Sequence, residues 1–280
     1  MDPSLRSNGS NTRLPTQPSV RTAGRSRLAG RVERVLNSAL AGERAAVLNA
    51  ASAELLADPV AVAAVFESAL DRPGVGVLGH FMAHELLRRS GLHDDLLNAL
   101  ASPHPATRAA AARICGAARL SESIVWIADL LQDASPPVQD AAVRSLSRLG
   151  GRRAVEQIMA SADGIPLYRL AIALSRAASD VDIEALMRQP ASERAAVATV
   201  LACGLRRDVL RVSPLLGIAH DRRWPLPVRL AACKALAMIG DRSAADGLHR
   251  LAEADPDQTV KKTADRAYRR LLRRAVSRPR

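Results

Sequence analysis

Aromatic side chains are scarce in this chain, which has two Trp, two Tyr and two Phe among 280 residues. Hydrophobic residues nevertheless make up 48% of it, and most of them are Ala and Leu. A β-rich core would use more aromatic and β-branched residues, whereas Ala and Leu are strong helix formers. The composition therefore favours closely packed helices. No run of 18 apolar residues occurs, so we expect no membrane span.

Cysteine is equally scarce, and Cys115, Cys203 and Cys233 lie far apart with no C-x-x-C spacing. Their odd number and wide spacing argue against a disulfide framework or a zinc knuckle. We expect them to be small buried hydrophobic residues. The first 20 residues lack the apolar segment of a secretory signal. Together these features predict a cytoplasmic protein in a reducing compartment.

The net charge of +12 is concentrated at the two ends of the chain. Residues 1–27 contain five Arg and one Asp, and residues 261–280 contain nine Lys or Arg and one Asp. The body between them therefore carries no net charge. A groove for duplex nucleic acid needs basic residues along the body. Nucleic-acid binding thus remains an alternative only through the basic termini.

Apolar residues recur with helical periodicity from Leu28 to about Leu272, between short breakers rich in Pro, Gly and Asp. The segments repeat every 25 to 35 residues around polar positions near the start of each second helix. These anchors are Arg108, Gln139, Arg169, Arg194, Arg229 and Lys261, with fainter copies at Arg44 and His80. Such a period predicts an all-α solenoid of about eight antiparallel helix pairs over residues 28–272. Residues 1–27 are expected to form a disordered basic tail rich in Ser, Pro and Arg, and residues 273–280 a basic C-terminal tail.

The helix starts "PATRAAAA" and "PVRLAA", with closing glycines at Gly150 and Gly240, resemble HEAT repeats. The short type found in phycobilisome-lyase-like proteins is the most similar. The resemblance implies a right-handed α-solenoid, and we expect no cofactor. It also implies an Asp six residues before each anchor, and Asp133, Asp163 and Asp255 keep that spacing.

The stretch "PGVGVLGHFMAHE" contains a G-x-G-x-x-G pattern at Gly74, Gly76 and Gly79. A dinucleotide-binding loop needs a strand that leads directly into the first glycine. Here Pro73 precedes that glycine, and the last apolar run ends several residues earlier. We therefore interpret the pattern as chance and predict no nucleotide site.

His80 and His84 stand four residues apart and could share a helix face to bind zinc, with His93 as a third ligand. On the repeat alignment, however, His80 occupies a structural anchor position. The related deoxyhypusine hydroxylases bind two irons through His-Glu pairs in several repeats. His84-Glu85 is a single pair, and it is out of register with that arrangement. The histidines are therefore predicted to be structural, with no metal.

DNA glycosylases with HEAT-like folds provide another comparison, because they combine a groove lined by Trp with a catalytic Asp. Trp126, Asp129 and Trp224 are the only corresponding residues, and their spacing does not match. The scarcity of aromatics also argues against base stacking. We expect neither a catalytic residue nor an enzyme.

Five residues after the last six anchors lie Arg113, Arg144, Leu174, Thr199, Lys234 and Arg266. Equivalent positions line up across a solenoid, and second helices usually line its concave face. The sequence therefore predicts a non-catalytic scaffold or adaptor that binds a protein partner, acidic in character, through Arg113, Arg144, Lys234 and Arg266. A solvated helix surface is the plainer interpretation.

Other functional hypotheses remain open. The main alternative is a nucleic-acid-binding protein of glycosylase-like type or acting through its tails. The resemblance also allows a lyase-like or chaperone-like role on a chromoprotein. The composition of the N-terminal tail is compatible with a secretion signal of a bacterial effector.

Overall fold

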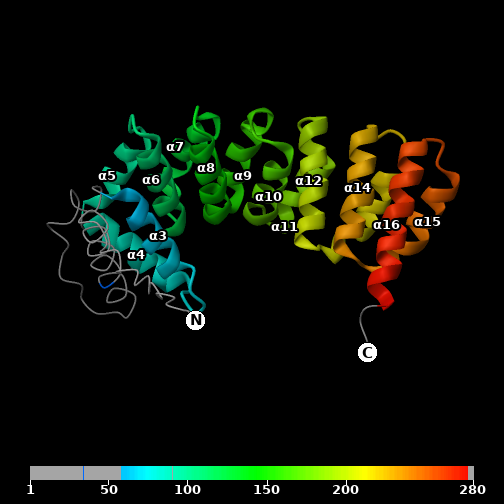
Figure 1. Ribbon diagram of the computed structural model, residues 1–280, viewed down its shortest axis with the longest axis horizontal. Helices are drawn as coiled ribbons and strands as arrows, with labels where there is room; N and C mark the ends of the chain where they lie inside the picture. Colours follow the sequence, from blue (N-terminus) through cyan, green and yellow to red (C-terminus); the bar gives the residue numbers. More distant parts are fainter. Residues whose placement is uncertain (1–33, 35–57, 90, 277–280) are drawn as a thin grey trace, which may run out of the picture.

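The computed structural model describes Arg34, residues 58–89 and residues 91–276, and these ranges contain helices and no strand (Figure 1). The α-helices are α3 (Pro59–Leu70), α4 (Val77–Arg89), α5 (Leu92–Leu100), α6 (Pro105–Ala117), α7 (Ile124–Asp129), α8 (Pro136–Leu149), α9 (Gly151–Ala160), α10 (Leu167–Ala177), α11 (Asp180–Arg188), α12 (Glu193–Arg206), α13 (Val212–His220), α14 (Leu226–Ile239), α15 (Ala245–Ala254) and α16 (Gln258–Val276). Short 3-10 helices are η1 (Ser121–Ser123), η2 (Leu130–Gln132), η3 (Ala162–Gly164), η4 (Val209–Arg211) and η5 (Arg242–Ala244). The all-α solenoid is confirmed. The predicted tail 1–27 and the first predicted pair, around Arg44, lie outside the described residues.

Several helices begin and end at the residues that the sequence marks. Pro105 and Pro136 occupy the first turn of α6 and α8, where a missing N–H group costs no hydrogen bond. Gly150 and Gly240 close α8 and α14 with positive φ angles of 62° and 80°, which glycine adopts without a steric penalty. Proline starts and glycine stops therefore set these boundaries locally.

The helices form two rows along the length of the array (Figure 1). Helices α3, α6, α8, α10, α12, α14 and α16 each pack against the next one, while the helices between them lie outside and touch one another less. The inner row of a curved solenoid is the more closely packed one, so we assign the first row to the concave side and call it the concave row. None of the helices in the described ranges is both long enough and apolar enough to cross a lipid bilayer.

Small residues allow the helices of the concave row to approach one another. A Cβ atom on Gly116 would lie 2.6 Å from the Cα atom of Ser145 on α8, the next helix of the row. A Cβ atom on Gly204 would lie 2.8 Å from the Cα atom of Ala235. Real Cβ atoms do not approach backbone so closely, so these two contacts require glycine.

The first described repeat differs from the prediction, which placed the helix around His80 in the row of second helices. That prediction was wrong, because α3 rather than α4 packs against α6. Helix α3 buries five apolar residues, including Val62 and Phe66, whereas α4 buries only Ala83 and Leu87. Since burial of apolar area stabilises the core, the more apolar helix takes the inner place.

Arginine–aspartate pairs join successive repeats. Asp133, which precedes α8, accepts two hydrogen bonds from Arg108 on α6, at 2.7 and 2.8 Å. Asp255, which precedes α16, forms a buried ion pair with Arg229 on α14. The carboxylate of each aspartate thus binds the arginine of the preceding repeat, while Gln139, six positions after Asp133, donates to the Asp133 carbonyl oxygen at 2.7 Å. The spacing predicted from the resemblance is present, but its partner lies one repeat back.

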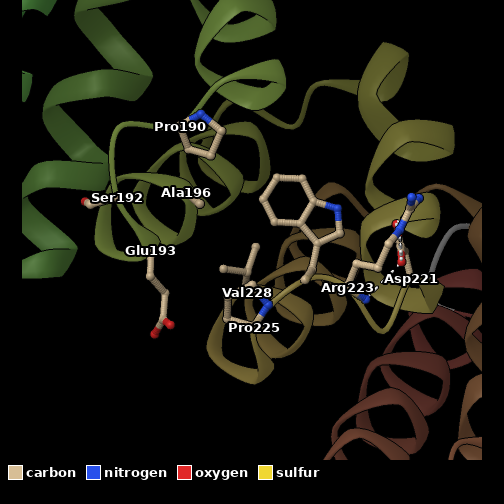
Figure 2. A pocket seen from close by; sticks show the side chains of 9 residues that line it. Pro190, Ser192, Glu193, Ala196, Asp221, Arg223, Pro225 and Val228 are labelled. Atoms are coloured by element: carbon tan, nitrogen blue, oxygen red, sulfur yellow. Dashed lines mark hydrogen bonds and ion pairs between the residues drawn. The ribbon is translucent and has the colours of Figure 1, made fainter.

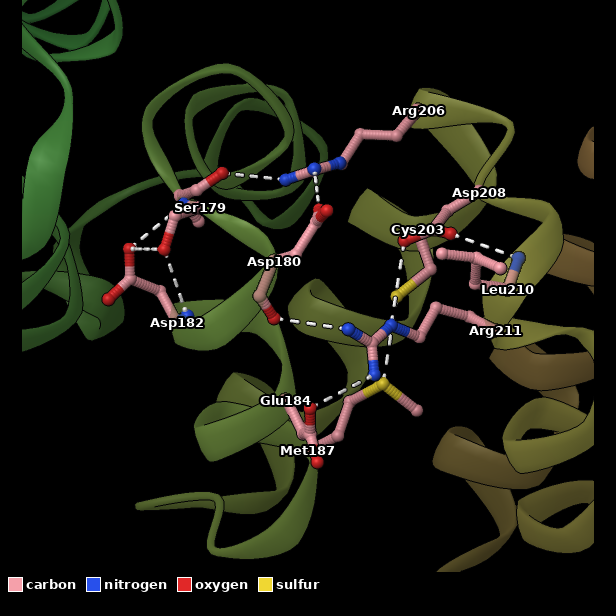
Figure 3. Close-up of polar contacts among 11 residues, drawn as sticks. Ser179, Asp180, Asp182, Glu184, Met187, Cys203, Arg206, Asp208, Leu210 and Arg211 are labelled. Carbon is pink, nitrogen blue, oxygen red and sulfur yellow. Dashed lines mark hydrogen bonds and ion pairs between the residues drawn. The ribbon is translucent and has the colours of Figure 1, made fainter.

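A polar network fastens α11 and α12 together (Figure 3). Ser179 and Asp182 form a capping box at the start of α11. Arg206 donates a hydrogen bond to the carbonyl oxygen of Ala178 at 2.6 Å and pairs with the carboxylate of Asp180. Arg211 donates to the carbonyl oxygen of Asp180 at 3.1 Å. These arginines satisfy backbone groups at the helix junction and have a structural role.

Candidate functional site: the concave row

Three of the four predicted binding residues present free charge on the concave row. Arg144 on α8, Lys234 on α14 and Arg266 on α16 are all exposed. Arg144 donates one long hydrogen bond of 3.4 Å to the carbonyl oxygen of Asp140. These three basic side chains therefore remain available to an anionic partner.

Arg113, the fourth predicted residue, is held within the fold. Its side chain is 25% exposed and forms an ion pair with Glu67 on α3. Glu67 also pairs with Arg148, at 2.6 Å. Burial raises the pKa of Glu67, but the hydrogen bonds and charges of the two arginines outweigh burial and hold the pKa below its ordinary value of 4.5. Arg113 is therefore already neutralised and offers less charge than the sequence suggests.

The register of the two middle helices differs from the sequence alignment. The backbone N–H of the residue that ends each helix donates to a carbonyl oxygen in the last turn. The acceptor belongs to Leu146 in α8, Leu174 in α10, Cys203 in α12 and Leu236 in α14. We therefore treat these four residues as equivalent. The positions equivalent to Arg144 and Lys234 are therefore Ile172 and Leu201, two residues from these reference points. The predicted Leu174 and Thr199 are buried.

With this register, one stripe of equivalent positions runs along the concave row, and we call it the concave stripe. Its residues are Arg144, Ile172, Leu201, Lys234 and Arg266. Ile172 and Leu201 are half-buried in the middle. Tyr168, one helical turn before Ile172, is 62% exposed. Exposed basic residues lie on either side, with Arg144 toward the N-terminal end and Lys234 followed by Arg266 toward the other. At these equivalent positions the row is thus apolar in the middle and basic at both ends, while Arg176, one turn after Ile172, adds an exposed charge in the middle.

A separate pocket of about 570 Å³ lies between the N-terminus of α12 and the loop before α14 (Figure 2). Pro190, Pro225, Val228 and Trp224 supply its apolar lining. Two of its polar groups pair within the fold: Arg223 pairs with Asp221 at 2.8 Å, and the Ser192 hydroxyl accepts from the N–H of Ala195. The pocket can receive an apolar side chain, but its serine acts as a helix cap and not as a nucleophile.

The glycine pattern forms no nucleotide site. Gly74 and Gly76 lie in the loop between α3 and α4, and Gly79 lies within α4. A helix, not a strand, precedes the loop. The strand-to-helix turn of a dinucleotide-binding loop is therefore missing from this region.

His80 and His84, which were considered and rejected as a zinc pair, have different partners in the fold. The Nδ1 atom of His80 lies 3.1 Å from the carbonyl oxygen of Ala117 on α6. Burial and the nearby Arg119 lower the pKa of His80. His84 instead lies near His93, with ring centroids 6.2 Å apart, and both approach Glu122. No sequence pattern pointed to Glu122, because it lies in a different element, η1.

The cysteines and tryptophans also have clear positions. Cys115, Cys203 and Cys233 are buried as predicted, and burial raises the pKa of Cys115 to about 12 and that of the other two to about 11. Trp126 lies on the outer helix α7, whereas Trp224 lies in the loop before α14. Several repeats separate them, so they do not share a groove.

The paired helices, the closely packed concave row and the Arg–Asp pairs between repeats define an α-solenoid repeat protein. Residues 94–177 match the family model of HEAT repeats, which confirms the resemblance over the three helix pairs from α5 to α10. No curated protein matches the chain.

Two solved structures are similar to this chain at low identity. One is human deoxyhypusine hydroxylase in complex with glycerol, at 16% identity over 92% of this chain and 100% of that chain, with a TM-score of 0.35. The other is an engineered protein, at 18% identity over 87% of this chain and 97% of that chain, with a TM-score of 0.33. Neither likeness is close enough to transfer a property to this chain.

Proposed function

We propose that this protein is a non-catalytic scaffold whose concave row binds an extended segment of a protein partner. The observation that carries the proposal is the stripe with Arg144 at one end, Ile172 and Leu201 in the middle, and Lys234 and Arg266 at the other end. HEAT-type solenoids expose extended concave surfaces suited to binding. Apolar area in the centre of an interface supplies affinity, while charges at its rim select the partner.

The spacing of the helices suggests what the partner segment looks like. Arg144 and Lys234 lie three helix steps apart in the concave row, which is about 24–30 Å at the usual interaxial distances. An extended chain covers that distance in about seven to nine residues. We therefore expect acidic side chains separated by about that number of residues, with apolar side chains between them.

The test uses a variant in which Arg144, Lys234 and Arg266 are all changed to Glu. Arg113 is left unchanged, because a Glu there would face Glu67 and disturb the fold. The control changes Arg153, Arg222 and Arg250 to Glu. These three are exposed outside the concave row, so the control has the same net charge.

Proteins captured from the native lysate after nuclease treatment are identified, and the affinity of the purified partner is then measured for each variant. The concave-row variant should bind the partner at least about tenfold more weakly, since it loses three rim charges, while the control stays near wild type. Equal binding by both variants contradicts the proposal. Capture of nucleic acid alone, with steep loss in salt, would support binding through the basic termini instead.

A further inference from the structure

Three side chains from different elements meet at the edge of the solenoid away from the concave stripe. His84 lies on α4, His93 at the start of α5 and Glu122 in η1. The Oε1 atom of Glu122 lies 3.1 Å from the Nε2 atom of His84 and 3.5 Å from the Nε2 atom of His93. One ligand atom from each residue lies within 4.8 Å of the other two. The fold thus brings together two imidazole nitrogens and one carboxylate oxygen.

The hydrogen bonding of His93 leaves a lone pair directed into this cluster. Its Nδ1 atom lies 2.9 Å from a carboxylate oxygen of Asp94. A carboxylate only accepts, so Nδ1 carries the proton, and Nε2 of the neutral ring has a lone pair. That Nε2 atom is buried and has no hydrogen-bond partner. In this form it faces the Glu122 oxygen, which is also an acceptor, so a proton or a metal ion is needed to join the two atoms.

The surrounding contacts match those of metal ligands. Histidine ligands usually donate their second ring N–H to a carboxylate, as His93 does to Asp94. Ligating carboxylates are themselves hydrogen-bonded, and the Ser121 hydroxyl donates to the second oxygen of Glu122 at 3.1 Å. These contacts fix the orientation of both groups before an ion binds.

We propose that His84, His93 and Glu122 bind a divalent transition-metal ion of the Zn²⁺ type, with a fourth position open to solvent. Bonds of about 2.0–2.2 Å in a tetrahedral site place neighbouring ligand atoms about 3.3–3.6 Å apart, close to the two measured separations of 3.1 and 3.5 Å. Two imidazole donors favour Zn²⁺ over the oxygen-seeking Mg²⁺ and Ca²⁺. The side chains of His84 and Glu122 are 31% and 40% exposed, so an ion can enter.

This proposal departs from the sequence prediction, which placed no metal in the chain. That prediction considered His80 as a partner of His84, whereas the structure replaces it with Glu122. The bound ion would also join α4, which packs chiefly against α5, to η1 just before α7.

The experiment titrates Zn²⁺ into the full-length, untagged, chelator-treated protein by calorimetry. Wild type should bind one ion with an affinity that Glu122→Gln lowers by at least about 100-fold. Asp94→Asn, which removes the carboxylate behind His93, should lower it by about 10- to 100-fold. Zn²⁺ should also slow amide exchange in residues 77–89 in wild type and not in Glu122→Gln.

Matched controls separate this site from general surface binding. Asp95→Asn makes the same change one residue along, away from the cluster. His249→Gln removes the other His–Glu pair, whose atoms lie 3.2 Å apart without a third ligand. Both controls should retain the affinity of wild type. No binding by wild type, equal binding by Glu122→Gln, or equal affinity for Mg²⁺ would overturn the proposal.

Discussion

The buried pair between Arg229 and Asp255 gives the sharpest test of how the repeats are joined. The two side chains are only 6% and 4% exposed. Arg229 also donates from Nε to the carbonyl oxygen of Ala219 at 2.9 Å, while Asp255 accepts from the N–H of Asp257. Asp255→Asn keeps the shape and an acceptor for that N–H but removes the charge that faces Arg229.

The expected cost follows from burial. Removing one partner of a buried ion pair leaves the other charge uncompensated, which costs about 3–5 kcal/mol. The control is Glu156→Gln, whose partner Arg152 is 86% exposed. An exposed pair contributes about 0–1 kcal/mol, so the control should hardly change the free energy of unfolding. The same removal of a carboxylate charge therefore has different consequences at the two sites.

Urea denaturation followed by tryptophan fluorescence provides the measurement. All variants carry Trp126→Phe, so that Trp224, five residues before Arg229, is the single reporter. Because repeats of a solenoid unfold partly independently, a local reporter is needed. A loss of less than about 1 kcal/mol for Asp255→Asn, or a loss equal to that of the control, would refute the inter-repeat clamp.

Two further predictions concern packing and acid stability. Gly116→Ala should lower the free energy of unfolding by about 1–3 kcal/mol, because its Cβ would meet the next helix. Gly217→Ala, whose Cβ would meet no neighbour, should raise the free energy of unfolding slightly through helix propensity. Thermal melts that find Gly116→Ala more stable than Gly217→Ala would contradict this packing. Hydrogen bonds from Arg108 hold the pKa of Asp133 below its ordinary value of 3.8, so the stabilisation is complete above pH about 4 and is lost as pH falls through the lowered pKa. The stability difference between wild type and Asp133→Asn, followed by urea denaturation across pH, should therefore shrink in acid; a difference that grows would contradict the assignment.

The candidate surface could be predicted only in part. Arg144, Lys234 and Arg266 are exposed where the repeat pattern placed them. Arg113 was assigned to the same stripe because its position repeats, but Glu67, 46 residues away in sequence, neutralises it. No local pattern reveals such a contact. The apolar middle of the stripe was missed because the alignment of α10 and α12 was two residues out of register.

The sequence by itself determined the helices and their stacking. Ala and Leu at helical spacing, proline at helix starts and glycine at helix ends act within a few residues, so they can be interpreted without the fold. The repeat period then predicts a solenoid, because one helix pair cannot bury its own apolar face.

Only the tertiary structure decided which helices occupy the concave row and which distant side chains meet. Helix α3 displaced α4 from the row because it has more apolar surface to bury. Asp255 pairs with Arg229 of the preceding repeat, and Glu122 lies beside His84 and His93. These outcomes depend on how whole helices pack against one another, which sums many weak contacts between residues far apart in the chain.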